Sequence, residues 1–197
     1  MAVLVNKQAP DFKATAAVGP NETKENYTLS QFQGKKYVVL FFYPKDFTFV
    51  CPTEIHAFQE KLGEFESRNT QVIGCSVDSE NSHMAWLRTP KNDGGIQGVT
   101  YPIVSDITKS ISRAYDVLDE EAGITYRATF VINKEGKVMA QNISHRPIGR
   151  NVDEIVRLVD AVQYNEEHGE VCPVNWSKGK KAMKGSNEGV RAYFQSK

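Results

Sequence analysis

Cys51 is the residue whose type and place point most clearly to chemistry in this 197-residue chain. Residues 37–43 are apolar, β-branched or aromatic, which indicates a buried strand. The pattern becomes helical after Pro52, and proline is preferred at the first helical position. Cys51 is therefore expected at or just before a helix N-terminus, where free N–H groups and the helix dipole favour an anion. A thiolate is such an anion, so this position predicts a nucleophilic sulfur.

The alternative for Cys51 is the usual fate of a free cysteine, which packs as a small buried hydrophobe. Two neighbours bear on the choice. Thr48 could accept a hydrogen bond from the thiol and donate one to a substrate oxygen, although a threonine here can equally be an ordinary turn or cap residue. Pro44 could shield the site and stiffen the turn, or simply end the strand.

A thiolate and a departing oxygen anion both need a cationic partner. Arg127 stands just before a predicted strand, where an arginine is normally a solvated surface residue. Arg150 and Glu54 lie next to predicted helix starts and could form an ion pair behind the sulfur. Glu54 could also be an ordinary first-turn acid.

The other two cysteines differ in their surroundings. Cys172 lies far along the chain from Cys51 and cannot form a local CxxC pair with it. It could condense with an oxidised Cys51 once a mobile arm brings it close. Cys75 lies in the strand pattern of residues 72–77, and we expect it to be structural.

The composition bounds the function. Lys plus Arg and Asp plus Glu both number 24, so no overall field favours nucleic acid or membrane. The longest apolar runs are strand-sized, too short to span a bilayer. The N-terminus lacks the layout of a signal peptide, so we expect a cytoplasmic protein. Three scattered cysteines and four scattered histidines resemble neither a secreted disulfide framework nor a metal site, so we expect no metal.

Strand-like and helix-like segments alternate, which favours an α/β fold with a mostly central sheet. The patterns predict strands at residues 37–43, 71–77 and 101–104, a hairpin of 128–133 with 137–143, and helices at 53–68, 81–88, 108–115 and 152–164, with a glycine-rich loop at 91–98. The character changes after Gly169, where a basic, glycine-containing stretch follows Cys172. We therefore expect one domain at 1–169 and an arm at 170–197.

Taken together, these motifs resemble the typical 2-Cys peroxiredoxins, including the bacterial alkyl hydroperoxide reductase C type. Pro44, Thr48 and Cys51 stand at the spacing of the family's active-site motif, within FTFVCPTE at residues 47–54. The segments that bear Arg127 and Arg150 match those of two active-site arginines. HGEVCP, at residues 168–173, resembles the resolving-cysteine motif. The resemblance covers nearly the whole chain.

The resemblance implies a thioredoxin-like fold in which helices flank a central mixed sheet and a C-terminal arm is added. It implies reduction of hydrogen peroxide and small organic hydroperoxides without a cofactor, with Cys51 as the peroxidatic and Cys172 as the resolving cysteine. It further implies a homodimer with an intersubunit disulfide, assembly into a decameric ring, and reduction by thioredoxin or a flavoprotein disulfide reductase. Chaperone activity as a holdase and a redox relay are alternative roles, whereas a thioredoxin-type oxidoreductase is disfavoured because the CxxC pair is missing.

Two features of the resemblance concern over-oxidation, namely GGIQG at residues 94–98 and the terminal pair Tyr193 and Phe194. The glycine motif departs from the usual form by the inserted Gln97. Residues 144–146 also depart from the family pattern, and we expect them to be peripheral.

Overall fold

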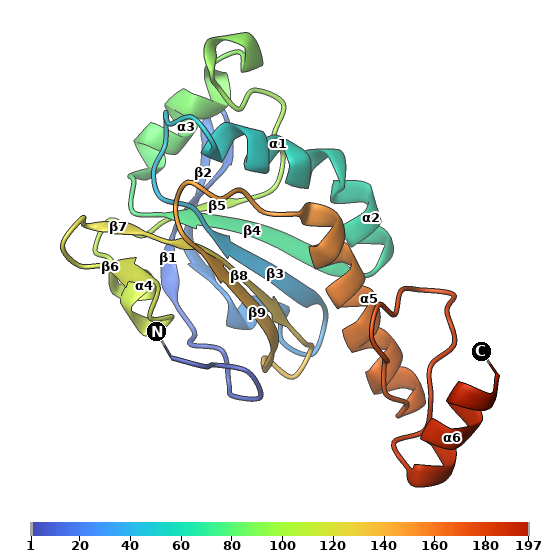
Figure 1. The fold of residues 1–197 in the computed structure, drawn as a ribbon. Coiled ribbons are helices and arrows are strands. Elements are labelled where there is room, and N and C mark those ends of the chain that lie inside the picture. Colours follow the sequence, from blue (N-terminus) through green and yellow to red (C-terminus); the bar gives the residue numbers. More distant parts are fainter. Residues whose placement is uncertain (1, 197) are drawn as a thin grey trace. The chain divides into compact units, whose positions relative to one another are not determined.

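The structure is a computed structural model that describes residues 2–196. Within these residues, a seven-stranded sheet has the order β2-β1-β5-β4-β3-β8-β9, and β6 and β7 form a separate two-stranded sheet (Figure 1). The strands are β1 (Lys13–Gly19), β2 (Glu22–Thr28), β3 (Tyr37–Phe42), β4 (Thr70–Ser76), β5 (Ile103–Ser105), β6 (Leu118–Asp119), β7 (Ile124–Thr125), β8 (Arg127–Ile132) and β9 (Val138–Ser144).

The sheet is mixed, as expected from the alternation of strands and helices. β3 pairs with β4 and β4 with β5 in parallel, whereas β8 pairs antiparallel with both β3 and β9. All six residues of β3 are buried, which fits a central strand that is covered on both faces. The register places Phe42 opposite Cys75 on one side and Ala128 on the other.

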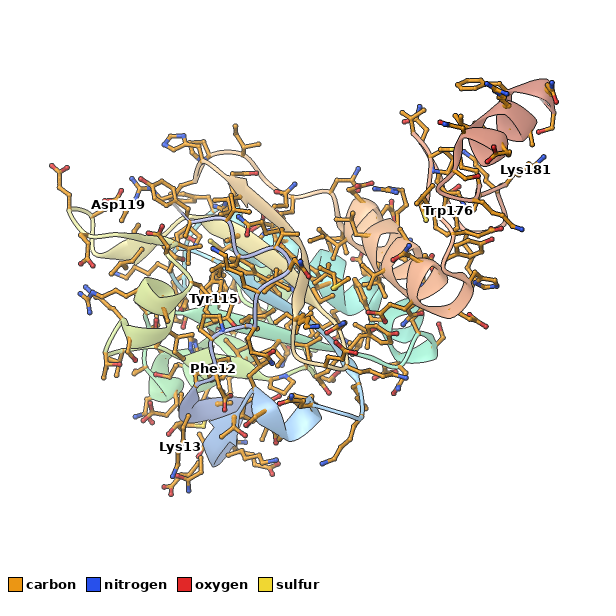
Figure 2. The ribbon with its side chains drawn as sticks, turned by 90° about the horizontal axis from the view of Figure 1, so that it is seen from below. Phe12, Lys13, Tyr115, Asp119, Trp176 and Lys181 are labelled. Carbon is orange, nitrogen blue, oxygen red and sulfur yellow. The ribbon has the colours of Figure 1, made fainter. Side chains whose placement is uncertain are left out.

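The two faces of the sheet carry different cores, because successive strand residues point to opposite faces. Val38, Leu40 and Phe42 join one apolar cluster, which also contains Phe12 and Tyr115, both labelled in Figure 2. Phe41 points the other way. Its ring stacks on that of Phe58 from helix α1, with 4.2 Å between the ring centroids. Helices α1 and α2 run along this second face (Figure 1).

The helices of this unit follow the predicted pattern with one correction. They are α1 (Cys51–Glu60), α2 (Leu62–Ser67), α3 (Glu80–Arg88) and α4 (Ser110–Ala114). The single helix expected at 53–68 is divided at Lys61, whose backbone leaves the helical region with φ −96° and ψ 4°. The apolar spacing continues across the break, since Phe58 and Phe65 are both buried, and this continuity hid the division.

Four strands were not predicted. β2 is a polar edge strand with mostly exposed residues, and β1 is rich in alanine, so neither has the β-branched alternation that marks a strand. β6 and β7 are two residues long and pair only with each other. Their sequences are too short to produce a recognisable period.

The chain divides into two compact units, Met1–Val152 and Asp153–Lys197. The boundary expected after residue 169 separates a domain from an arm that carries Cys172, and this functional division stays a prediction. The second unit holds nearly all of α5 (Val152–His168), an irregular segment, and α6 (Asn187–Gln195).

α6 was not predicted, because its residues are largely polar. Ser186 caps it by accepting a hydrogen bond from the Gly189 backbone N–H. None of the helices within residues 2–196 has the length and apolar content to cross a membrane.

Candidate active site

Cys51 is the first residue of α1, at the end of the loop that leaves β3. Its side chain is completely buried. Among the described residues, no side chain caps this helix start, and Pro52 at the second position has no N–H group. The sulfur therefore lies at the positive end of the helix dipole, as the sequence predicted.

Arg127 comes to the sulfur from the first position of β8. Its alternation with Ala128, which lies in the opposite core cluster, directs Arg127 to the face that α1 covers. Arg127 Nη1 lies 3.3 Å from Cys51 Sγ and 2.5 Å from Glu54 Oε2. Only 3 % of Arg127 is exposed. Arg127 is therefore not the solvated surface residue that an arginine at a strand edge normally is.

Glu54 joins the two arginines behind the sulfur. Its Oε1 accepts hydrogen bonds of 2.9 Å from both the backbone N–H and Nε of Arg150. The three side chains are all almost fully buried. Two guanidinium groups and one carboxylate leave this buried cluster with one excess positive charge beside the sulfur. That charge can stabilise a negative charge that develops on a departing oxygen.

The backbone fixes the second arginine in place. Arg150 Nη2 donates to the Phe42 carbonyl at 2.6 Å, Nη1 donates to the Ala128 carbonyl at 3.2 Å, and the guanidinium lies 5.1 Å from the centre of the Phe41 ring. Burial lowers the pKa of Arg150, while the facing Glu54 carboxylate opposes that shift. Arg150 therefore ties the carboxyl end of β3 and the amino end of β8 to the acid on α1.

The segment at residues 144–146 is not peripheral, contrary to expectation. The Arg146 carbonyl accepts a 2.5 Å hydrogen bond from Arg127 Nε. The Arg146 side chain in turn donates to Asp119 at 2.8 Å and lies over the ring of Tyr126. This support acts through a backbone carbonyl, which leaves no side-chain signature in the sequence.

Pro44 and Thr48 lie in the loop between β3 and α1. Pro44 is buried and Thr48 is partly buried. The Thr48 hydroxyl donates to the Lys45 carbonyl at 2.9 Å. Its oxygen can still accept, but donation to a substrate requires the hydroxyl to rotate. The role expected for Thr48 toward the sulfur stays a prediction.

A buried polar network holds the same loop to α3, and the sequence did not reveal it. Asp46 Oδ2 lies 2.8 Å from His83 Nδ1 and accepts from the Ser82 hydroxyl at 2.7 Å. The Tyr43 hydroxyl donates to Asp46 Oδ1 at 2.7 Å. Burial, followed by the charge of Asp46, raises the pKa of Tyr43 well above its ordinary value, so its proton stays available to the carboxylate. Charge-assisted hydrogen bonds thereby hold the loop before Cys51 against α3.

The glycine segment at 94–98 packs against the same region. A Cβ on Gly95 would lie 2.0 Å from the Thr89 carbonyl oxygen, so only glycine fits there. The Gly95 carbonyl lies 3.0 Å from Nε2 of His56 on α1, and the Gly94 carbonyl accepts from the Trp86 indole at 2.9 Å. The segment thus contacts both α1 and α3.

The remaining cysteines lie in different environments. Within the described chain, Cys51, Cys75 and Cys172 are all free thiols. Cys75 is buried in the core cluster on the other face of the sheet, and burial raises its pKa well above the ordinary value. Cys172 is partly buried in the C-terminal unit, with Sγ 3.7 Å from the Ala161 carbonyl.

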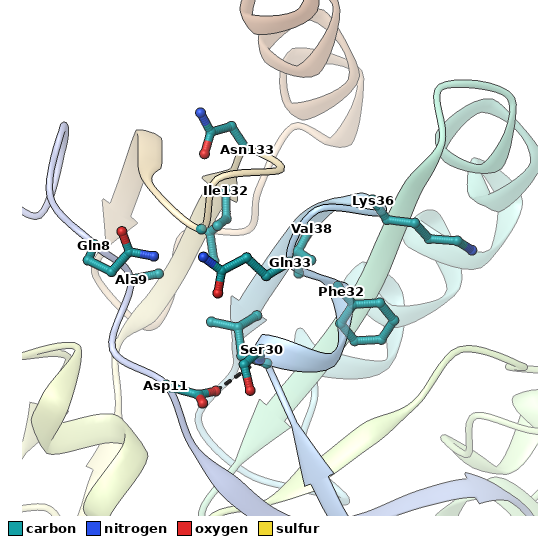
Figure 3. A pocket seen from close by; sticks show the side chains of 12 residues that line it. Gln8, Ala9, Asp11, Ser30, Phe32, Gln33, Lys36, Val38, Ile132 and Asn133 are labelled. Carbon is teal, nitrogen blue, oxygen red and sulfur yellow. Dashed lines mark hydrogen bonds between the residues drawn. The ribbon is translucent and has the colours of Figure 1, made fainter.

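Residues 2–196 contain no group of three or more His, Cys, Asp or Glu side chains that could hold a metal ion. A cavity of about 160 Å³ lies near the N-terminal segment, where Asp11 accepts from the Ser30 backbone N–H (Figure 3). None of the predicted site residues lines this cavity.

Comparisons with known proteins agree with this geometry. Residues 5–141 match the AhpC/TSA family, and residues 161–196 match the C-terminal domain of 1-Cys peroxiredoxin. The chain is 54 % identical over 193 residues to alkyl hydroperoxide reductase C of Helicobacter pylori, covering 98 % of this chain and 97 % of the relative. It belongs to the typical 2-Cys peroxiredoxins.

Two further relatives bear on fold and activity. A thioredoxin peroxidase of Trypanosoma brucei rhodesiense is 48 % identical over 98 % of this chain and 96 % of its own length. The crystal structure of reduced 2-Cys peroxiredoxin from Plasmodium vivax superposes with a TM-score of 0.95 at 49 % identity, covering 98 % and 100 % of the two chains. This peroxiredoxin therefore has the expected thioredoxin-like fold with a C-terminal extension, and it is a thiol peroxidase that reduces peroxides.

Proposed function

We propose that Cys51 is the peroxidatic nucleophile and that Arg127 is its cationic partner. The observation that carries this proposal is the 3.3 Å approach of Arg127 Nη1 to Cys51 Sγ in a fully buried site. Glu54 and Arg150 support Arg127 from behind, since Glu54 binds both guanidinium groups. Pro44 shields the sulfur, and Thr48 positions the peroxide.

The first step is a nucleophilic substitution on oxygen. The Cys51 thiolate attacks the terminal oxygen of a hydroperoxide, a sulfur–oxygen bond forms, and the oxygen–oxygen bond breaks. Cys51 becomes a sulfenic acid, and the departing alkoxide or hydroxide takes a proton to leave as alcohol or water. Arg127 lies where it can stabilise the developing negative charge, which is the usual role of a fixed donor at a departing oxygen. Hydrogen peroxide and small organic hydroperoxides are the substrates that suit this step.

The second step forms a disulfide between Cys51 and Cys172 of the partner subunit. The sulfur–sulfur bond forms as the sulfur–oxygen bond of the sulfenic acid breaks and water leaves. A disulfide needs the two Cα atoms within about 7 Å. Cys51 is buried in the first turn of α1, so this turn must open before the two sulfurs meet.

The cycle closes when an external dithiol reduces the disulfide. Thioredoxin and a flavoprotein disulfide reductase are the two candidate reductants, and the name of the trypanosomal relative, thioredoxin peroxidase, favours the first. The protein needs no cofactor of its own in this scheme, because each electron pair comes from a thiol. We propose a cytoplasmic homodimer that assembles into a decameric ring.

The test separates the two cysteines. Cys51→Ser should consume no peroxide, whereas Cys172→Ser should reduce one equivalent and then stop when thioredoxin is the reductant. Oxidised wild-type protein should run as a covalent dimer on a non-reducing gel, and neither variant should. Normal cycling by Cys172→Ser would contradict the role of Cys172, and an oxidised monomer with an internal Cys51–Cys172 bond would contradict the intersubunit pairing.

The reductant is found by supplying each candidate alone. Peroxide consumption is followed with thioredoxin and thioredoxin reductase, and separately with a flavoprotein disulfide reductase of the alkyl hydroperoxide type. The scheme expects sustained turnover with at least one of them. If neither supports more than a single turnover while a small-molecule dithiol does, both named reductants are wrong.

A further inference from the structure

The surroundings of Cys172 contain a cation that the scheme above does not use. Cys172 Sγ faces α5 at the Ala161 carbonyl, 3.7 Å away. Arg157 lies four residues before Ala161 on the same helix, and residues four apart occupy the same helical face. The guanidinium of Arg157 is therefore on the side of α5 that the thiol contacts.

Arg157 also holds the segment that carries the thiol. Its Nη1 donates to the Trp176 carbonyl at 3.0 Å, and Trp176 lies four residues after Cys172. Trp176 is 2 % exposed, and its ring lies 5.0 Å from that of Tyr164, one further turn along α5 (Figure 2 labels Trp176). The Trp176 indole donates to the Lys180 carbonyl at 3.0 Å, which closes the loop on itself.

A second contact fixes the orientation of the guanidinium. Glu154 accepts from Nε and Nη2 of Arg157 at 2.6 and 2.7 Å. These bonds use one edge of the planar group and leave Nη1 for the Trp176 carbonyl. A bidentate pair of this kind sets direction as well as charge. Because the pair is partly exposed, solvent weakens its contribution to stability.

The charges around Cys172 act in opposite directions. Burial raises the pKa of its thiol, whereas the positive charge of Arg157 lowers it. Tyr164 on α5 also faces the thiol, and its hydroxyl donates to Glu170 on the arm at 2.8 Å. Tyr164 is neutral at physiological pH, because that hydrogen bond to Glu170 raises its pKa further. Among these groups, Arg157 is the one that favours the thiolate.

We propose that Arg157 is a positioning residue for the resolving step, which holds the arm by the Trp176 carbonyl and stabilises the Cys172 thiolate. This inference rests on the proposed role of Cys172. In the step, the thiolate attacks the sulfenic sulfur of Cys51 of the partner subunit. The new sulfur–sulfur bond forms, the sulfur–oxygen bond breaks, and hydroxide leaves as water after taking a proton from solvent.

The test measures the reactivity of Cys172 without peroxide. In a Cys51→Ser background, iodoacetamide modification of the Cys172 peptide is followed by mass spectrometry across a pH series. Arg157→Gln should move the midpoint of the pH profile upward and slow modification near neutral pH about threefold, a reduced version of the effect of a close charge because the site is partly exposed. Arg157→Lys should restore most of the rate, since it keeps the charge.

A matched control removes a different cation from the same arm. Lys178 is 73 % exposed and lies 3.9 Å from Asp160, so Lys178→Gln should leave the midpoint unchanged. An unchanged midpoint in Arg157→Gln contradicts the proposal. An equal upward shift in both the Gln and the Lys variants also contradicts it, because the charge would then not be the cause.

A second readout ties the effect to the reaction. In the otherwise unchanged protein, the rate of disulfide formation after one equivalent of peroxide should fall in Arg157→Gln, while the rate of sulfenic acid formation should not. An equal fall in both rates would contradict a role confined to Cys172. If Cys172→Ser instead cycles normally, the proposed function fails, but the pH profile of Cys172 still decides whether Arg157 governs its thiol.

Discussion

Cys51 and Cys75 are both fully buried free thiols, yet they lie in opposite electrostatic environments. Cys75 is in the middle of the sheet, opposite Phe42 in the register, and packs into an apolar cluster. Cys51 begins a helix and has the Arg127 guanidinium 3.3 Å from its sulfur. Burial, followed by the charge of Asp106, raises the pKa of Cys75 well above its ordinary value, which makes this thiol a poor nucleophile. The buried cations are what distinguish the surroundings of Cys51 from those of Cys75.

The comparison extends to stability. The cluster around Cys51 contains two arginines and one glutamate that are almost completely removed from water. Such a cluster is costly unless every charge has a partner. Cys75 itself packs among apolar side chains, and the charge that acts on it is the buried Asp106 carboxylate, which raises its pKa. The two sites should therefore respond differently to the loss of one side chain.

The largest effect is expected from Glu54→Gln. This change leaves Arg127 and Arg150 facing each other without the acid that joins them. Breaking a buried pair in this way destabilises a protein by about 3–5 kcal/mol. Denaturant unfolding measures the loss, with Glu64→Gln as the matched control, because Glu64 is 45 % exposed and its pair with Lys61 is worth less than about 1 kcal/mol. Equal losses of unfolding free energy in the two variants would show that the buried ion pairs contribute no more to stability than an exposed one.

Arg127→Gln should have the next largest effect, which is on the rate of the reaction with peroxide. Removing one fixed donor from a developing oxygen anion typically slows catalysis about 10²–10³-fold. Stopped-flow measurement of the reaction with hydrogen peroxide tests this, with Arg127→Lys expected to lose less because it keeps the charge. A rate within a factor of about two of the wild-type rate would contradict the proposed role of Arg127 in the peroxide reaction.

The smallest effect is expected at the other end of the comparison. Cys75→Ala should leave the peroxide reaction unchanged and reduce the free energy of unfolding by about 1–2 kcal/mol, because it removes one buried sulfur and leaves a small cavity. The same kinetic and denaturant measurements apply. A clear loss of peroxidase rate with unchanged stability would mean that Cys75 is more than a core residue.

The sequence predicted the central strands and the helix start at Cys51 better than the edges of the fold. Cys51 and Pro52 mark a helix start through local rules, and the buried strand before them is a long apolar run. The edge strands β1 and β2 and the helix α6 were missed, because mostly exposed segments carry no strong apolar period. The division of α1 from α2 was hidden by apolar spacing that continues through Lys61.

Within the site, the ion pair between side chains was predictable and the support from the backbone was not. The residue types and positions of Glu54 and Arg150 suggested an ion pair, and the structure places them 2.9 Å apart. The Arg146 carbonyl that holds Arg127 could come from any residue type, so no pattern marks it. The link between Asp46 and His83 joins segments that are distant in sequence, and only the fold brings them together.

The central claim is that the Arg127 guanidinium beside the sulfur makes Cys51 the reactive thiol. The most direct test is the rate at which iodoacetamide modifies Cys51 at one fixed neutral pH in a Cys75→Ala, Cys172→Ser variant, where Cys51 is the remaining thiol, compared with the same variant carrying Arg127→Gln. The account predicts rapid modification in the parent and the loss of most of that rate in the Arg127→Gln variant. Equal rates in the two proteins would contradict it.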